Sequence, residues 1–522
     1  MPGGAVATGN GVGGDVRPSN PWPGILMATF AAFGGILFGY DTGTISGVKV
    51  MPDWLCTFGT RFGPGFGQCS ITTSQESLIV SILSLGTFFG ALLAAPLADG
   101  IGRRLALQVA ATRIPLFVVG RVVAGLGVGL VSCTAPMYQS ECSPKWIRGA
   151  VVACYQWAIT IGLLLASIVN NSEQNRPNHS GWRIAIGLQF IWAAILAGGM
   201  WLMPESPRYL IRQGRDMEAE RSLARLMSTE TSDPVVAAEL SDIRANLRQE
   251  MERSSGGYKE LLSSENQILF RVLSGVFLQA WQQLTGINFI FYYGTTFFKN
   301  SGISNPFLIS VATNVVNVGM TVPGMWAVDK VGRRSLLLIG AAGMLFCEYI
   351  IAIVGVTIST SNLAGQKVLI AFVCIYIAFF AATWGPIAWI VTGEIYPLNI
   401  RAKAMSISTA SNWLWNFGIG YATPYLVNPG AGHANLGVKV FFIWGTTCVG
   451  CLVFTYFCIP ETKGLSLEQI DIMYANTTPI NSASYRKTLL EHDIHAVDVE
   501  GGRVNIQDLH EQDEKNIAEH KE

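Results

Sequence analysis

The alternation of long apolar segments with short charged turns is the feature that most restricts the fold of this chain. Mainly apolar runs occupy residues 25–47, 74–98, 149–169 and 182–203, among others. Each is about as long as the roughly 20 residues that a membrane-spanning helix needs. Half of the 522 residues are hydrophobic and only 13% are charged. We therefore predict an all-α polytopic membrane protein.

The second half of the chain repeats the first, turn by turn. Three turns occur twice in the same order: residues 98–104 and 328–334, residues 141–148 and 394–401, and residues 204–208 and 460–464. Such a repeat predicts two homologous bundles of six helices, nominally twelve transmembrane helices, with any substrate bound between them. The expected parts are an N-terminal tail (1–24), an N-terminal bundle (25–206), a charged helical linker (207–265), a C-terminal bundle (266–462) and a polar, mobile C-terminal tail (463–522).

The distribution of basic residues predicts the orientation. The repeated turns, the linker and the tail carry most of the charge and all fall on one side of the predicted membrane. The positive-inside rule makes that side cytosolic, with both termini inside a plasma membrane. Cys56 and Cys69 then lie in an external loop, where either could form a disulfide with the other or elsewhere. Asn170 and Asn178 head two sequons that we expect on another external loop.

One apolar run carries an unusual set of amides, Gln279, Gln282, Gln283 and Asn288. Gln279 and Gln283 share a helical face, whereas Asn288 would lie roughly 140° from Gln283 in an unbroken helix. Gly286 can relax the helix and let Asn288 turn toward the glutamines. These amides are either polar contacts between packed helices or a site for a neutral, hydroxyl-rich solute, because amides and sugar hydroxyls both donate and accept hydrogen bonds.

Two charged residues, Asp41 and Arg121, fall within other predicted spans. Ionisable residues inside a membrane are functional candidates by default. A carboxylate that meets an arginine in only one conformation would bind protons differently in the two states, and this would couple proton binding to transport. The alternative is a static ion pair that holds the first half together.

The ordered set of turns and the Gln-Gln-x-x-Gly-x-Asn stretch resembles the sugar porters of the major facilitator superfamily, most closely fungal hexose transporters. The similarity covers about residues 25–470. It implies a major facilitator fold and a D-glucose or other hexose substrate. It also implies proton symport for members with residues like Asp41 and Arg121, although some facilitators keep the acid. An acid that some animal members carry before the Gly-Pro segment is Ala381 here. The implied sugar contacts are Gln156, Gln282, Gln283, Asn288, Asn317, Trp389, Asn412 and Trp413.

The repeated turns also imply a charge network that latches one conformation and breaks in the other. Plain solvated turns are the alternative. The network members would be Asp99, Arg103, Arg104, Glu141, Arg148, Asp329, Arg333, Arg334, Glu394 and Arg401.

The third span is shorter than its counterpart. Arg334 and Glu394 are 60 residues apart, whereas Arg104 and Glu141 are 37 apart. Residues 105–117 make at most ~20 Å of helix, against a hydrocarbon core of about 30 Å. The third helix is therefore expected to be truncated near Leu107 and Gln108. Either a coding segment is missing from this sequence, or the protein carries the deletion and its transport is impaired.

These observations predict hexose transport across the plasma membrane by alternating access, with protons as the coupled ion. Facilitated diffusion and a non-transporting glucose sensor are the alternatives, although a sensor is expected to carry a longer signalling tail than the residues after Gly464. The chain shows no nucleophile constellation, metal-ligand spacing or phosphate loop, so we expect neither an enzyme nor a bound cofactor or metal. Its net charge of zero gives no reason to expect a nucleic-acid partner.

Overall fold

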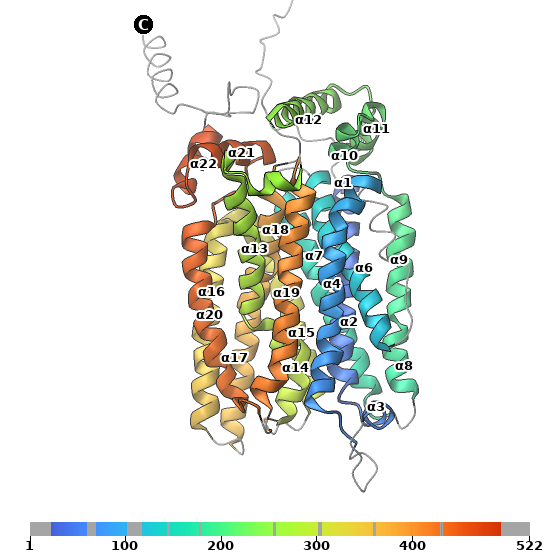
Figure 1. Cartoon of the computed structure of the whole chain (residues 1–522), viewed down its shortest axis with the longest axis vertical. Coiled ribbons are helices and arrows are strands. Elements are labelled where there is room, and N and C mark those ends of the chain that lie inside the picture. Colours follow the sequence, from blue (N-terminus) through green and yellow to red (C-terminus); the bar gives the residue numbers. More distant parts are fainter. Residues whose placement is uncertain are drawn as a thin grey trace, which may run out of the picture.

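The computed structural model is an elongated helical bundle (Figure 1). It describes residues 22–59, 69–101, 117–143, 147–176, 179–253, 257–300, 305–358, 362–397, 399–428, 430 and 432–491. Its elements within those ranges are all helices.

The helices fall into a first half before the linker and a second half after it. The first half contains α1 (Trp22–Phe30), η1 (Ala31–Phe33), α2 (Gly34–Val48), α3 (Pro52–Phe58), α4 (Thr73–Ile101), α6 (Phe117–Cys142), α7 (Arg148–Glu173), α8 (Ser180–Gly187) and α9 (Gln189–Leu202). The second half contains α13 (Ile268–Leu284), α14 (Ile287–Asn300), α15 (Pro306–Val331), α16 (Arg333–Thr357), α17 (Leu363–Ala382), α18 (Trp384–Glu394), α19 (Arg401–Val427), η4 (Gly437–Lys439) and α20 (Val440–Cys458). The halves lie side by side, with α4 against α19 and α7 against α15.

Eight helical segments of the described chain are long and apolar enough to cross a membrane. These are Trp22–Val48, Thr73–Leu97, Arg148–Glu173, Ser180–Leu202, Pro306–Val331, Arg333–Thr357, Leu363–Glu394 and Gly437–Cys458. Three more long segments, α6, α13–α14 and α19, run alongside them. The short third span expected at residues 105–117 lies almost entirely outside the described residues, which resume at Phe117.

Small residues allow the helices of the first half to approach closely. A Cβ added at Gly125 of α6 would lie 2.3 Å from the carbonyl oxygen of Leu83 in α4. A Cβ at Gly39 of α2 would lie 1.9 Å from the carbonyl oxygen of Ile159 in α7. Without a hydrophobic driving force in lipid, such close backbone contact is a principal source of helix association. These glycines therefore fix the pairs α4–α6 and α2–α7.

Two membrane helices of the second half are broken. Gly286 has a φ of +80° and separates α13 from α14, at the position where the sequence predicted a relaxed helix. Thr383, with φ −133° and ψ −87°, separates α17 from α18 and lies just before Gly385 and Pro386. Both breaks release backbone groups near the middle of the bundle, where side chains of neighbouring helices can reach them.

The linker contains α10 (Pro207–Arg212), α11 (Asp216–Met227) and α12 (Pro234–Arg253), as the charge pattern predicted. They form a small apolar cluster of their own, which includes Leu210, Leu223 and Leu240. We call the end of the bundle that carries them the linker end, and the opposite end the α3 end (Figure 1).

The expectation of a mobile tail from about Leu465 is wrong as far as Glu491. Residues 467–476 and 482–491 form α21 (Leu467–Asn476) and α22 (Ser482–Glu491), which pack on the linker end. Arg271, fully buried in α13, forms an ion pair with Asp471 and lies over the ring of Tyr474 at 4.2 Å. Burial raises the pKa of Tyr474. The tail after Glu491 lies outside the described residues.

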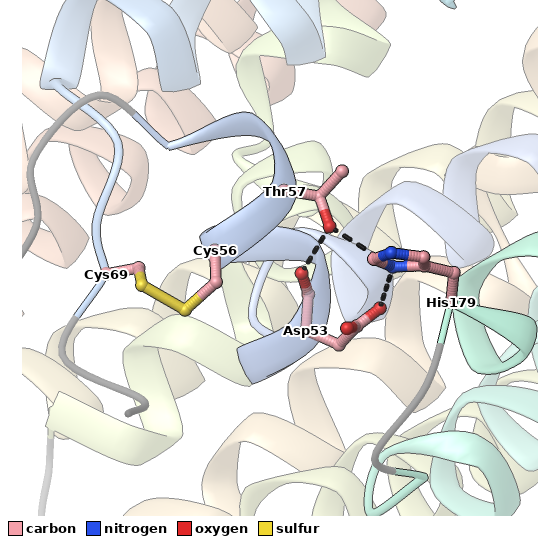
Figure 2. Close-up of a disulfide and its surroundings, with 5 residues drawn as sticks. All are labelled: Asp53, Cys56, Thr57, Cys69 and His179. Carbon is pink, nitrogen blue, oxygen red and sulfur yellow. Dashed lines mark hydrogen bonds and ion pairs between the residues drawn. A yellow bond between two sulfur atoms is a disulfide. The ribbon is translucent and has the colours of Figure 1, made fainter. Parts of the chain in front are cut away.

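The α3 end carries a disulfide (Figure 2). Cys56 of α3 is bonded to Cys69, one of the pairings that the sequence left open. Beside it, Asp53 pairs with the imidazole of His179 at 3.0 Å. Asp53 also accepts a hydrogen bond from the indole of Trp182 at 3.0 Å. These contacts join α3 to the start of α8.

The sequon at Asn170 was misplaced on a loop. Asn170 lies inside α7, is 2% exposed, and donates a hydrogen bond to the carbonyl of Gly43 at 2.9 Å. Glycosylation at this position is therefore incompatible with the fold. Asn178, which heads the other sequon, lies outside the described residues.

Candidate substrate and proton sites

A cluster of buried amides lies where α13, α14 and α19 meet. Gln279 and Gln282 of α13 both accept hydrogen bonds from Asn412 of α19, at 2.7 Å each. Gln282 in turn donates to the carbonyls of Trp384 and Gly385, at 3.0 and 2.9 Å, beside the break between α17 and α18. The cluster is thus buried, uncharged and anchored to both broken helices.

The break at Gly286 brings Asn288 to this cluster. Asn288 of α14 donates a hydrogen bond to Gln283 of α13, which in an unbroken helix it could not face. Gln283 also accepts a bond from Asn416 of α19 at 3.2 Å. The predicted turn of Asn288 toward the glutamines is therefore present.

The remaining predicted sugar contacts line the boundary between the two halves. Trp389 of α18 meets Tyr155 of α7 edge to face at 5.5 Å, and Trp413 of α19 meets Phe38 of α2 at 4.8 Å. Gln156 of α7 is 5% exposed and packs near Gly385. Asn317 of α15 is fully buried, and neither its oxygen nor its nitrogen has a hydrogen-bond partner among the described residues.

Asp41 and Arg121 form a buried ion pair in the first half. Nη2 of Arg121 (α6) lies 3.5 Å from Oδ2 of Asp41 (α2), and the two residues are 8% and 6% exposed. The other carboxylate oxygen accepts a hydrogen bond from Gln189 of α9 at 3.0 Å. The pair therefore joins three helices of one half.

A chain of hydrogen bonds leads from Tyr292, which lies near this pair, to the amides. Tyr292 of α14 interacts electrostatically with both Asp41 and Arg121. Its hydroxyl donates to Asn416 at 3.0 Å, and Asn416 also accepts from Ser84 of α4 at 2.7 Å. Because Asn416 donates to Gln283, two bonds separate Tyr292 from the amide cluster.

Arg333 is the centre of a charge network at the linker end of the second half. It pairs with Glu394 at 2.8 Å and with Asp329 at 3.0 Å, and it is 2% exposed. Asp329 also accepts a bond from the backbone N–H of Ala150 in α7 at 3.3 Å. This contact carries the network across to the first half.

The other predicted network members are placed less uniformly. Glu141 accepts a hydrogen bond from Ser206, and Arg148 is buried at the start of α7. Arg401 donates to the carbonyl of Tyr396 at 2.9 Å. Arg334 donates to the carbonyl of Tyr456 at 2.8 Å. Asp99 lies in α4, but its side chain, like all of Arg103 and Arg104, falls outside the description.

The structure adds polar residues that the sequence reasoning did not select. Gln189 and Asn416 join the ion pair and the amides, respectively. Glu461 accepts hydrogen bonds from the backbone N–H groups of Arg333 and Arg334, at 2.9 and 3.2 Å. Glu461 could have been found, because it belongs to the repeated Pro-Glu turn at residues 460–464.

A second charged contact, also missed, closes the α3 end. Lys49 pairs with Glu76 of α4 at 2.7 Å, and its ammonium lies 3.7 Å from the ring centroid of Tyr293 in α14. Burial lowers the pKa of Lys49, although Glu76 opposes this effect. Lys49 and Glu76 belong to the first half and Tyr293 to the second, so the halves touch at this end as well.

The arrangement has a counterpart among known protein families. The family described as "Sugar (and other) transporter" matches residues 27–474, which is most of the chain. This chain belongs to the sugar transporters of the major facilitator superfamily. It is a multi-pass membrane protein with the fold of that family. The resemblance that the repeated turns suggested is confirmed.

Individual members of the family are similar over most of their length. The major facilitator-type transporter ecdD of Aspergillus rugulosus is 51% identical over 87% of this chain and 87% of its own length. A probable glucose transporter of Neurospora crassa, rco-3, is 48% identical over 87% of this chain and 79% of its own. The high glucose sensor RGT2 of Saccharomyces cerevisiae is 43% identical over 86% of this chain and 60% of its own.

A solved structure agrees with the fold. The proton:xylose symporter XylE bound to 6-bromo-6-deoxy-D-glucose matches with a TM-score of 0.75 and 28% identity, over 87% of this chain and all of that chain. These relatives are transporters and a sensor rather than enzymes, which favours a non-enzymatic role.

Proposed function

We propose that this sugar transporter moves a hexose, D-glucose in the first instance, across the plasma membrane by alternating access, with the charged linker end in the cytosol. The observation that carries the proposal is the amide cluster of Gln279, Gln282, Gln283, Asn288 and Asn412. It is buried, uncharged and placed at the boundary between the halves, where transporters built from repeats bind their substrates.

The amides suit a sugar because their bonds can be exchanged. Each amide offers two donors and two acceptor lone pairs, and each sugar hydroxyl offers one donor and two acceptor lone pairs. Gln283 and Asn288 now satisfy one another, and a sugar would replace that bond with its own. Asn317, which has no partner among the described residues, would gain one. A neutral ligand fits best, since the cluster has no charge to compensate an ion.

We further propose that transport is coupled to protons through Asp41. The carboxylate is held by Arg121 at 3.5 Å, a distance at which the attraction is strong but the hydrogen-bond geometry is absent. A conformational change that separates the pair would favour protonation of the acid. The path from Tyr292 through Asn416 to Gln283 offers a route by which sugar binding and that change could influence one another.

The network around Arg333 would act as the cytosolic latch. Asp329 reaches the backbone of α7 in the first half, so opening this end requires that contact to break. Lys49 and Tyr293 would form the matching contact at the external end. Alternating access needs the two contacts to break in turn rather than together.

The test is uptake of labelled D-glucose by cells that lack their own hexose transporters, with and without an inward proton gradient. Uphill accumulation that a protonophore abolishes supports symport. Equilibration without accumulation supports facilitated diffusion. Glucose binding without any uptake supports a sensor, a candidate kept open because RGT2 is a relative.

The short third span is tested in the same assay. A variant with additional apolar residues between Leu107 and Gln108 would restore the length that a span requires. We expect the lengthened protein to reach the surface in larger amounts. Equal surface amounts and equal uptake for both proteins would mean that the deletion is tolerated.

A further inference from the structure

The break between α13 and α14 is supported by side chains of two neighbouring helices, α17 and α20. Tyr376 of α17 donates a hydrogen bond from its hydroxyl to the carbonyl of Thr285 at 2.6 Å, and both residues are fully buried. Thr447 of α20 donates to the carbonyl of Leu284 at 2.5 Å. The same hydroxyl lies 2.7 Å from the carbonyl of Trp444 in its own helix, so its proton is shared between the two. The last two carbonyls before the break therefore each have a side-chain donor.

These side-chain donors replace two hydrogen bonds of a continuous helix. In an unbroken α13–α14 the same carbonyls would accept from the backbone N–H groups of Asn288 and Phe289, four residues further along. Here the N–H of Phe289 donates instead to the carbonyl of Gly286, at 3.0 Å. A carbonyl without a donor is costly inside a membrane, where no water replaces the lost bond. The hydroxyls of Tyr376 and Thr447 therefore lower the free energy of the broken form relative to that of a straight helix.

The indole of Trp444 closes the space beside Gly286. A Cβ added at Gly286 would lie 2.5 Å from Cγ of Trp444, and its φ of +80° is one that residues with side chains rarely adopt. Glycine also adopts negative φ values readily, so Gly286 by itself permits a straight helix as well. The choice between the two forms is therefore decided by the contacts around the break, of which the two hydroxyl bonds reach the backbone directly.

The break determines where α14 presents its polar side chains. Asn288 follows Gly286 by two residues and bonds Gln283, although the two amides would lie roughly 140° apart in a straight helix. Tyr292, one turn further along α14, bonds Asn416 at 3.0 Å. A change at the break would move both contacts together. The amide cluster therefore depends on groups that lie outside it.

We propose that Tyr376 and Thr447 are positioning residues for the sugar site, which hold the break in the form that turns Asn288 toward Gln283. The inference rests on the proposed hexose transport and deepens it, because it adds two residues that set the affinity for sugar without belonging to the amide cluster. Transporters built from repeats use broken helices to form their binding sites. Here the two hydroxyls keep that helix broken.

The first experiment removes each hydroxyl and measures D-glucose uptake. Tyr376→Phe removes the hydroxyl alone, and Thr447→Val replaces it with a methyl group. Loss of one hydrogen bond shifts the ratio of broken to straight forms about fivefold. Each variant should therefore raise the KM about threefold, because less of the protein is ready to bind. The maximal rate at equal surface amounts should change little, since saturating sugar draws the protein into the broken form.

Matched variants remove the same groups at other places. Thr447→Ser keeps the hydroxyl and should retain the unaltered KM. Thr446→Val changes the next residue of α20, which is exposed and donates to Phe442 of its own helix at 2.8 Å. Tyr138→Phe removes a buried hydroxyl that donates to the carbonyl of Pro204 at 2.7 Å in the first half. Neither of these two changes should alter the KM.

A double-mutant cycle separates positioning from general damage. Asn288→Ala removes the side chain whose place the break determines. In that background, Tyr376→Phe should add little to the KM, because the side chain that it positions is gone. General destabilisation would raise the KM by the same factor in both backgrounds.

The second experiment needs no sugar. Gln283→Cys and Asn288→Cys, introduced together, place two thiols where the amides meet in the broken form. A short bifunctional methanethiosulfonate is added to the purified protein, and the link between the two thiols is measured by mass spectrometry. Tyr376→Phe should lower the yield of the link about threefold, in proportion to the population of the broken form. Tyr138→Phe should leave it unchanged.

The outcomes distinguish the positioning role from the transport proposal. An unaltered KM in both Tyr376→Phe and Thr447→Val, with normal uptake by the unaltered protein, would overturn the positioning role and leave transport standing. Equal increases with and without Asn288 would overturn it as well. Absence of uptake by the unaltered protein would reject the transport proposal. In that case the yield of the link still decides whether Tyr376 holds the break, and an unchanged yield would overturn that claim too.

Discussion

The two halves of this transporter bring different chemistry to the boundary between them. In the middle of the first half the polar group is a charged pair, Asp41 with Arg121, held at 3.5 Å. In the middle of the second half the polar groups are the amides of α13, α14 and α19. A carboxylate responds to protons and an amide does not. The duplicated fold thus separates a group suited to proton binding from groups suited to a neutral sugar.

The second half also buries an acid, but in a different position. Glu348 of α16 is fully buried and lies 3.3 Å from the thiol of Cys448 in α20, within its own half. The Asp41–Arg121 pair, by contrast, interacts electrostatically with Tyr292 of the opposite half. This difference in position, rather than burial alone, makes Asp41 the better candidate for coupling.

The largest effect that we predict is the loss of uphill transport in Asp41→Asn. One unit of pH difference can drive about tenfold accumulation of a sugar moved with one proton. The variant cannot change its charge, so its accumulation ratio should fall to about one while glucose exchange continues. The measurement is steady-state labelled glucose in cells at external pH values one unit apart.

Glu348→Gln is the matched control for Asp41→Asn. It neutralises a buried acid in the other half and should leave the accumulation ratio unchanged at equal surface amounts. Undiminished accumulation in Asp41→Asn would remove the coupling proposal. Equal losses in both variants would mean that the two halves share the proton chemistry.

The next largest effect concerns the charge network that Arg333 centres in the second half. Arg333→Ala would leave Glu394 and Asp329 without their common partner, at a cost of about 3–5 kcal/mol for a broken buried pair. We expect a lower unfolding temperature in detergent and less protein at the surface.

Arg244→Ala provides the comparison for Arg333→Ala. Arg244 pairs with Asp216 on the exposed linker helices at 2.9 Å, and such surface pairs contribute about 0–1 kcal/mol. Similar unfolding temperatures for the two variants would show that the Arg333 network adds no more than a surface pair, and the latch would have to be sought elsewhere.

The sequence predicted those features that depend on neighbours along the chain. Apolar runs gave most of the helices, and Gly286 gave the break that turns Asn288 toward Gln283. The repeated turns identified Asp329, Arg333 and Glu394, because the same charged motif occurs at the matching position in each half. In each case the feature depends on residues that are close in the chain, or on a motif that occurs in both halves.

Features that depend on distant contacts were not predicted. Lys49 follows the end of α2, Glu76 lies in α4 and Tyr293 lies in α14, and no periodicity connects them. Helix α21 begins with a capping box of Ser466 and Gln469, a local signal that the sequence reasoning did not use, whereas its docking through Asp471 on the buried Arg271 is a contact between distant residues. The sequon at Asn170 was placed on a loop for a related reason. The end of α7 and the hydrogen bond from Asn170 to Gly43 both depend on contacts between helices.

A moderate effect is expected at the amide cluster in the second half. Gln283→Ala removes a side chain that bonds both Asn288 and Asn416. Loss of one net hydrogen bond of about 1.4 kcal/mol would raise the KM for D-glucose about tenfold. The measurement is the concentration dependence of initial uptake, normalised to surface protein.

A surface amide controls for general destabilisation in the Gln283 experiment. Asn362 caps α17 through bonds to the N–H groups of Ala364 and Gly365. Asn362→Ala should cost about 1 kcal/mol of helix stability and leave the KM unchanged. An unaltered KM in Gln283→Ala would withdraw the amide cluster as the sugar site.

The smallest effect that we predict is at Gln156, the amide that the first half presents on α7. Gln156 is a single side chain, whereas α13, α14 and α19 of the second half contribute several amides. A sugar held mainly by those three helices should therefore lose little affinity when the Gln156 side chain is removed. Gln156→Ala is expected to raise the KM about threefold, equivalent to about 0.6 kcal/mol. The measurement is the KM for D-glucose uptake of Gln156→Ala and Gln283→Ala, determined side by side.

If Gln156→Ala raises the KM as much as Gln283→Ala does, the sugar is held equally by both halves. The division between a proton-binding half and a sugar-binding half would then be wrong, and Asp41 would act on a sugar already in contact with its own half.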